Sequence, residues 1–234
     1  MMKSHPQSTD DLAHFSGMAP IFPLPNVVLF PHLPLPLHIF EERYRKMTAD
    51  ALHGDRLIAM ALLQPGWETD YEGTPAIHEM VCIGKIVVEE RLESGRYNLV
   101  LQGIQRAVVI EEPTTDLPYR VGRFELYRDF YPKNGRVNHE VRHKELLLSF
   151  RRLFPRHQTD ALFTQALDAD IPLGVLCDLL THALKIDPLA KQEILEELDV
   201  DLRSELVLTR IREALSAAGL ETTGTKFPPE FSLN

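Results

Sequence analysis

The residues whose spacing is most suggestive of catalysis are His139, Glu140 and His143, which form an H-E-x-x-H sequence. On a helix, two histidines four residues apart lie on one face and could bind Zn²⁺, with the glutamate as the general base of a peptidase. The context argues against this chemistry, because Arg142 and Lys144 place positive charges beside the metal position and no third ligand is indicated by spacing. We therefore expect a solvated first helical turn there, with no bound metal.

Other catalytic patterns are missing from the sequence. It contains no G-x-x-x-x-G-K-[ST] phosphate loop, no G-x-G-x-x-G and no G-x-S-x-G. Cys82 and Cys177 each lie in an apolar pattern, where a free cysteine usually packs as a small hydrophobic side chain. Asp178 is expected to point away from the apolar stripe of Cys177 and to form no dyad with it. We therefore expect no catalytic residue and no cofactor.

Composition excludes several classes of protein. The 234 residues carry a net charge of −9, which disfavours general attraction to nucleic-acid phosphates or anionic lipid. Two cysteines cannot form a disulfide framework, so a reducing compartment, the cytoplasm, is expected. No apolar run approaches the roughly 20 residues that span a bilayer. Residues 1–19 lack the apolar stretch of a secretory signal and are expected to be a flexible N-terminus.

Residues 20–132 are expected to form a β-rich unit. Six prolines between Pro20 and Pro36 exclude a helix interior or a central strand, so this stretch should be an extended edge or loop. A short helix is predicted from the spacing of Phe40, Tyr44, Met47 and Ala51. Strands are predicted at 57–63, 81–88, 97–102, 107–110 and 123–126, with Gly103 as a break and a hairpin turn at 94–95. This pattern favours a mostly antiparallel sheet or barrel.

Residues 138–218 are expected to form a helical bundle, after a turn-rich break at 131–135. Leucines, isoleucine and phenylalanine recur at intervals of three and four within 146–153, 173–184 and 208–215. Thr159 and Asp187 are predicted helix caps, and Gly219 is a predicted helix stop. Residues 219–234 are expected to be a loose tail. The fold class predicted from the whole chain is α+β.

The chain resembles the Lon N-terminal (substrate-binding) domain family over about residues 20–215. The resemblance rests on five stretches in the family's order, which are FPLPNVVLFP (22–31), LPLHIFEERY (35–44), GKI (84–86), GRYNLVLQGIQRA (95–107) and DPLAKQEILEELDV (187–200). It implies a PUA-like β-rich subdomain followed by the helical bundle. The ATPase and Ser-Lys peptidase domains of full Lon proteases and the zinc-binding cysteines of cereblon-type relatives are absent from this sequence. The chain is therefore similar to the stand-alone bacterial form, for which peptidase names would be inherited labels.

The resemblance implies a non-catalytic module that binds proteins or unfolded peptide segments. From the residues, the loop 65–75 is a candidate binding site because it places Trp67 and Tyr71 among glycine, proline and acidic residues. The Pro-rich segment 30–38 also carries apolar side chains outside a regular element. We expect the two to share one rim and form a groove, with Phe30, His32 and Leu33 completing the binding residues.

Two alternatives stay open. PUA-like sheets also occur in RNA-modifying proteins, so RNA binding is one, although acidic residues outnumber basic ones in both 1–137 and 138–218. A local basic patch at Arg43, Arg45 and Lys46 is more simply the solvated face of a helix. The zinc peptidase built on His139 and His143 is the other. Nothing in the sequence indicates an oligomeric state.

Overall fold

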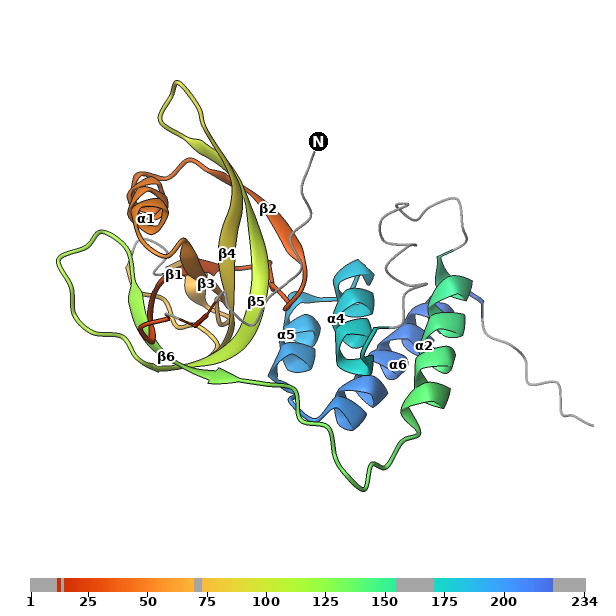
Figure 1. Cartoon of the computed structure of the whole chain (residues 1–234). Coiled ribbons are helices and arrows are strands. Elements are labelled where there is room, and N and C mark those ends of the chain that lie inside the picture. The colour runs from red at the N-terminus through yellow and green to blue at the C-terminus, as the bar shows by residue number, and fades with distance from the viewer. Residues whose placement is uncertain (1–11, 14, 70–72, 155–170, 221–234) are drawn as a thin grey trace, which may run out of the picture.

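Strands dominate the first half of the chain and helices the second (Figure 1). The computed structural model describes residues 12–13, 15–69, 73–154 and 171–220. In chain order the first half contains β1 (Met18–Leu24), β2 (Pro34–Ile39), α1 (Glu42–His53), β3 (Leu57–Leu62), the short 3₁₀ helix η1 (Trp67–Thr69), β4 (Met80–Arg91), β5 (Tyr97–Glu111) and β6 (Val121–Tyr127). The second half contains α2 (His139–Leu153), α4 (Leu173–Ala183), α5 (Pro188–Glu196) and α6 (Val200–Ala217). The predicted α+β class is confirmed.

The sheet closes into a barrel because its longest strand has different neighbours along its length. The strand order is β2-β5-β4-β3-β1-β6, and β5 pairs with β6 as well. The first half of β5 pairs with β2 and the second half with β6, so that β5, β4, β3, β1 and β6 form a ring and β2 lies outside it. Among the pairs of named strands in the described residues, only β1 and β3 run parallel. The mostly antiparallel barrel is therefore confirmed.

The Pro-rich stretch is more central than its composition predicts. Pro20 and Pro23 lie in β1, which is between β3 and β6 in the sheet. The prolines fit because β1 pairs with β6 over 18–20 and with β3 over 21–24, so neither proline needs ladder partners on both sides. Pro34 and Pro36 lie in β2, an edge strand as predicted. The start of β1 at Met18 also corrects the predicted end of the N-terminal segment at residue 19.

Gly103 does not interrupt a strand, contrary to the prediction. β5 runs through it from residue 97 to 111. The glycine is required for a different reason: a Cβ at residue 103 would lie 2.1 Å from the carbonyl oxygen of Phe30. The backbone before β2 thus passes directly over β5, and the N–H of His32 donates to the Gly103 carbonyl at 2.9 Å. This close approach fixes the loop 30–33 against the barrel.

Helix α1 covers one face of the sheet. Tyr44, Met47 and Ala51 are buried against strand residues that include Phe22 and Ile58, as their spacing predicts. Phe40 does not join them, because the helix begins at Glu42 and the Phe40 side chain is 59% exposed. The apolar period thus identified the helix, but its first residue, Phe40, lies two residues before the start of α1.

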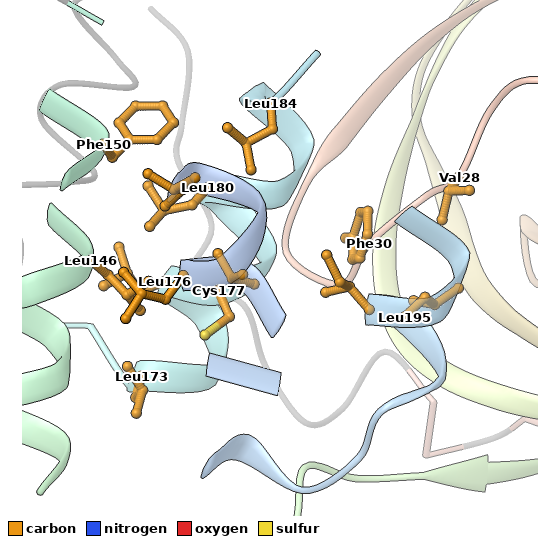
Figure 2. Packing of buried hydrophobic residues seen from close by; sticks show 14 of the residues in the cluster. Val28, Phe30, Leu146, Phe150, Leu173, Leu176, Cys177, Leu180, Leu184 and Leu195 are labelled. Carbon is orange, nitrogen blue, oxygen red and sulfur yellow. The ribbon is translucent and has the colours of Figure 1, made fainter. Parts of the chain in front are cut away.

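The helices pack on the barrel through one apolar cluster. Figure 2 shows Val28 and Phe30 of the barrel side in the same cluster as Leu195 of α5 and Leu176 and Leu180 of α4. Helix starts follow the expected chemistry, since the side chain of Asp187 accepts the N–H of Leu189. Gly219 adopts φ of 67° just after α6 and is the predicted stop. The predicted cap Thr159 and the tail from residue 221 onward lie outside the described residues.

Within the described ranges, no helix has both the length and the apolar character needed to cross a membrane.

Gly103→Ala tests the close approach of Phe30. The added methyl group would overlap the Phe30 carbonyl, and overpacking of this kind costs about 1–3 kcal/mol or more. Denaturant unfolding should therefore show a clear loss of stability. The matched control is Gly54→Ala, whose Cβ would lie no closer than 3.6 Å to a neighbour. Equal stability of the two variants would contradict the described path of residues 30–33.

Candidate partner-binding surface

Of the three predicted binding residues in the Pro-rich segment, two are buried and one is exposed. Phe30 is fully buried and Leu33 is 5% exposed, and both lie in the cluster between barrel and helices. They are packing residues and have no surface to offer a partner, which corrects the prediction for these two. His32 between them is exposed and holds a left-handed backbone with φ of 67°. The tight turn therefore directs its two apolar neighbours inward.

Trp67 lies in η1 and is half-buried against the apolar cluster of the barrel interior. Tyr71, its predicted companion, lies outside the described residues. The role of both side chains in partner binding stays a prediction.

The loop 65–75 and segment 30–38 line two different depressions of the described surface. Gly73, Thr74 and Pro75 line a depression of about 420 Å³ at one end of the barrel, together with residues of the β5–β6 connection. Pro36, Leu37 and His38 line another, of about 430 Å³, on the face formed by β2, β5 and β4. Neither set of lining residues includes members of the other segment. The single groove expected from the sequence is therefore replaced by two separate sites.

The barrel-end depression contains two arginines, and a carboxylate neutralises each. Arg43 pairs with Glu41 at 3.1 Å and lies over the ring of Tyr44. Arg120 makes two hydrogen bonds to Glu112 and donates a third to the carbonyl of Pro75 at 2.7 Å. Arg120 thus joins the loop before β4 to the connection after β5. Arg120 thus has a structural role between two connections, and Arg43 is paired within its own segment at the start of α1.

The second depression lies on a sheet surface with an unusual apolar row. Pro36, Val100 and Val88 are directly opposite one another on β2, β5 and β4. Val88 is 53% exposed, and Val87 beside it is 50% exposed at an irregularity of the β4–β5 ladder. Strands that face solvent normally carry polar side chains at such positions. This row is therefore an apolar surface without a covering element in the described structure.

A polar row runs beside the apolar one. Nδ1 of His38 lies 2.8 Å from Oδ1 of Asn98, and Nδ2 of Asn98 donates to Oε2 of Glu90 at 3.0 Å. These three residues are also opposite one another on β2, β5 and β4. The Phe40 ring stacks on His38 with 6.2 Å between centroids. We call the six residues of the two rows the sheet face: Pro36, Val88, Val100, His38, Glu90 and Asn98.

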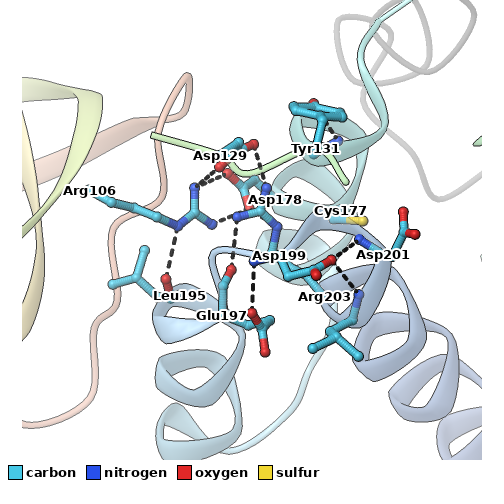
Figure 3. A network of polar contacts seen from close by, with 12 residues as sticks. Arg106, Asp129, Tyr131, Cys177, Asp178, Leu195, Glu197, Asp199, Asp201 and Arg203 are labelled. Atoms are coloured by element: carbon cyan, nitrogen blue, oxygen red, sulfur yellow. Dashed lines mark hydrogen bonds and ion pairs between the residues drawn. The ribbon is translucent and has the colours of Figure 1, made fainter. Parts of the chain in front are cut away.

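A buried network of four charges joins the barrel to the helices (Figure 3). Arg106 of β5 binds Asp178 of α4 through two hydrogen bonds of 2.7 and 3.0 Å, and its Nε donates to the carbonyl of Leu195. Arg203 of α6 donates to Asp129 at 2.5 Å, and Asp129 also pairs with Arg106. Burial alone would lower the pKa of Arg203, but Asp178 and Asp129 raise it above its usual value. All four charges are compensated.

Sequence reasoning missed this network. Asp178 is 1% exposed, although it was expected to point away from the packed stripe of its helix. One signal in the sequence could have indicated a buried charge: a single carboxylate lies at the centre of a largely apolar helix. This signal does not identify the partner, Arg106, which is 72 residues away.

Two residues of the H-E-x-x-H sequence, His139 and Glu140, have side-chain partners, whereas Nε2 of His143 is buried without a hydrogen-bond partner among the described residues. Nε2 of His139 lies 2.6 Å from Oδ1 of Asp201, whose other oxygen accepts the N–H of Arg136 at 2.7 Å. Because Asp201 is 1% exposed, the predicted solvated turn is wrong at His139. Glu140 is exposed and pairs with Lys144. In the part of the chain that the structure describes, no three His, Cys, Asp or Glu side chains are grouped to hold a metal ion.

Comparison with known proteins places these observations in a family. The family model described as "ATP-dependent protease La (LON) substrate-binding domain" matches residues 18–213. The chain is 31% identical over 204 residues to a Lon protease of Dictyoglomus thermophilum, covering 85% of this chain and 25% of that protein. It is 30% identical over 235 residues to a Lon protease of Roseiflexus castenholzii, covering 98% of this chain and 28% of the relative. The chain thus spans about a quarter of these relatives.

Solved structures show the same fold. The N-terminal domain of a Mycobacterium avium complex Lon protease matches with a TM-score of 0.67 at 13% identity, covering 84% of this chain and 98% of that one. A Lon N-terminal domain protein from Xanthomonas campestris matches with a TM-score of 0.58 at 21% identity, covering 82% and 97%.

Arg106→Met tests the buried network. Removing one partner of a buried ion pair leaves the other charge uncompensated, which costs about 3–5 kcal/mol. Denaturant unfolding should show a loss of this order. The control is Arg123→Met, since the Arg123–Glu111 pair is 60% and 52% exposed and such pairs contribute about 1 kcal/mol or less. Equal losses in the two variants would contradict the network's role.

His139→Ala distinguishes a structural histidine from a metal ligand. The buried carboxylate of Asp201 would lose a partner, at a cost of about 1–3 kcal/mol. Thermal melting should therefore occur earlier, whereas Glu140→Ala, its exposed neighbour, should melt with the parent protein. Added Zn²⁺ or a chelator should leave the melting of the parent unchanged. A chelator that lowered its melting temperature would revive the metal site.

Proposed function

The chain belongs to the ATP-dependent protease La (LON) substrate-binding domain family, and from this premise we propose that it binds unfolded segments of other proteins on the sheet face, without catalysing a reaction. The observation that carries the proposal is the apolar row of Pro36, Val100 and Val88, which lines a depression of about 430 Å³ and in which Pro36 and Val88 are exposed and Val100 is half-buried. Contiguous apolar surface on a strand face is a mark of interaction sites. Unfolded segments offer the apolar side chains that such a row would cover.

The edge of β2 favours recognition by side chains. An extended peptide could instead add a strand to a free sheet edge and bond to its backbone. Pro34 and Pro36 have no N–H, and together with His38 they occupy alternate positions of β2. The prolines therefore remove donors that an added strand would need, and they protect the edge against uncontrolled pairing. A partner would have to lie over the face.

The burial and the protonation of the two cysteine thiols support a non-catalytic role. Cys82 and Cys177 are fully buried, and burial raises the pKa of each to about 12. Both thiols are therefore neutral near pH 7 and inaccessible as nucleophiles. They are also unpaired, which suits a protein of the reducing cytoplasm.

RNA binding is less well supported than protein binding. The candidate cations Arg43 and Lys46 are paired with Glu41 and Asp50, so the expected basic patch is locally neutralised. Arg45 lies near the carbonyl of Ser94 at 3.4 Å. Phosphate recognition requires a surface with an excess of basic groups.

Val88→Asp tests the proposed surface. A charge in the apolar row should weaken binding of a permanently unfolded protein, reduced and carboxymethylated lactalbumin, by on the order of tenfold, or about 1.4 kcal/mol. Fluorescence anisotropy measures the binding. Because Val88 is 53% exposed, the melting temperature should barely change.

Ile110→Asp is the matched control, because Ile110 is 54% exposed at the far end of β5. It should bind like the parent protein. Equal weakening in both variants, or salt-dependent binding of single-stranded RNA in place of unfolded protein, would contradict the proposal.

A further inference from the structure

We propose that the sheet face selects segments in which a large apolar side chain and a lysine or arginine are separated by one residue. This inference rests on the proposed function and specifies its substrate class. It follows from three features of the face: the spacing of its two rows, the apolar depression in one and the single carboxylate in the other.

The spacing of the rows matches alternate residues of an extended chain. Pro36, Val100 and Val88 precede or follow His38, Asn98 and Glu90 by two positions on each strand. Positions i and i+2 of a strand point to the same face and lie about 6.6–6.8 Å apart. A segment that lies along β5 in an extended conformation therefore places side chains i and i+2 over the two rows, and side chain i+1 away from them. The order depends on the direction of the segment.

The first row accepts an apolar side chain. Val88, Val100 and Pro36 present only carbon atoms in their side chains, and the depression that they line has a volume of about 430 Å³. A large aliphatic or aromatic group would cover apolar surface that water now contacts. Val87, at the adjoining irregularity of the ladder, is a further exposed apolar side chain.

The second row presents a negative charge to a partner. Glu90 is the only Asp, Glu, Lys or Arg among the described lining residues. Its carboxylate accepts one hydrogen bond from the neutral amide of Asn98, and no ion pair joins it to a cation within the described residues. The nearby cations are engaged elsewhere, since Arg56 pairs with Glu89 and Arg91 lies over the Tyr97 ring.

Asn98 fixes the position of this charge. Because its Oδ1 faces His38 Nδ1, the amide nitrogen is directed to Oε2 of Glu90. The ladder of three side chains holds the carboxylate at the edge of the row. A lysine or arginine at this position could place its aliphatic stem on the face and its charge near Glu90.

Labelled peptides in a serine–threonine background provide the test. One peptide places Phe and Lys with one residue between them, a second places them adjacent, and a third replaces Lys by Glu at the first spacing. Anisotropy titrations of the full chain should show the first peptide bound about threefold more tightly than either of the others, the effect expected of one partly exposed ion pair. Glu90→Gln should remove this preference and Glu90→Lys should reverse the preference for Lys over Glu.

Glu125→Lys is the matched control, because it changes the net charge equally at an exposed position of β6 and should leave the preference intact. Equal binding of the spaced and adjacent peptides, or an unchanged preference in Glu90→Lys, would overturn the inference. If Val88→Asp still weakens binding of unfolded protein in that case, the proposed function stands and only the selectivity is wrong. If Val88→Asp has no effect on that binding, the proposed function itself fails.

Discussion

Four paired charges from distant parts of the chain, three of them buried and Asp129 partly buried, hold the two halves of the molecule in one arrangement. Arg106 belongs to the barrel, Asp178 and Arg203 belong to separate helices, and Asp129 lies in the segment that connects the halves. Charges in a protein interior are tolerated only when geometry and hydrogen bonds compensate them, so a shift of one half against the other would leave several uncompensated at once. Gly174 shows how closely the network is packed, because a Cβ there would lie 2.1 Å from Oδ2 of Asp129. Apolar packing alone is non-directional, so it would fix the relative orientation of the two halves less strictly than these ion pairs do.

The rest of the structure follows from this fixed arrangement. Arg106 anchors the second half of β5 beside α4 and α5, and the loop 30–33 fills the apolar gap between them through Phe30 and Leu33. The first half of β5 is then left to pair with β4 and β2, in a hairpin that projects from the barrel (Figure 1). On this projecting part lie the two rows of the sheet face. The helices pack near one end of β4 and β5, so the apolar surface at the other end of these strands stays exposed.

The sequence predicted what depends on local periodicity, and it failed where distant residues decide. The helices from α2 onward and the β4–β5 hairpin follow from apolar spacing and turn residues such as Gly95. The burial of Phe30 and Leu33 does not follow from local spacing. An apolar residue in a loop gives the same sequence pattern whether a distant helix of the same chain or a binding partner covers it. Asp178 fails for the same reason. Val88 ends a run that reads as a buried strand, and its exposure becomes evident only when the hairpin is seen to extend beyond the elements that bury Val81 and Ile83.

In the proposed function, a rigid two-part scaffold presents one apolar sheet surface to unfolded protein. Methyl NMR during titration with an unfolded protein measures this most directly, because valine and leucine methyl groups report from every part of the molecule. We expect shifts at Val87, Val88 and Val100, and unchanged signals at Leu146, Leu176 and Leu208 in the helical core. Shifts concentrated in the helical core, or at Leu63 of the cluster that Trp67 packs against with none at Val88, would contradict binding on the sheet face.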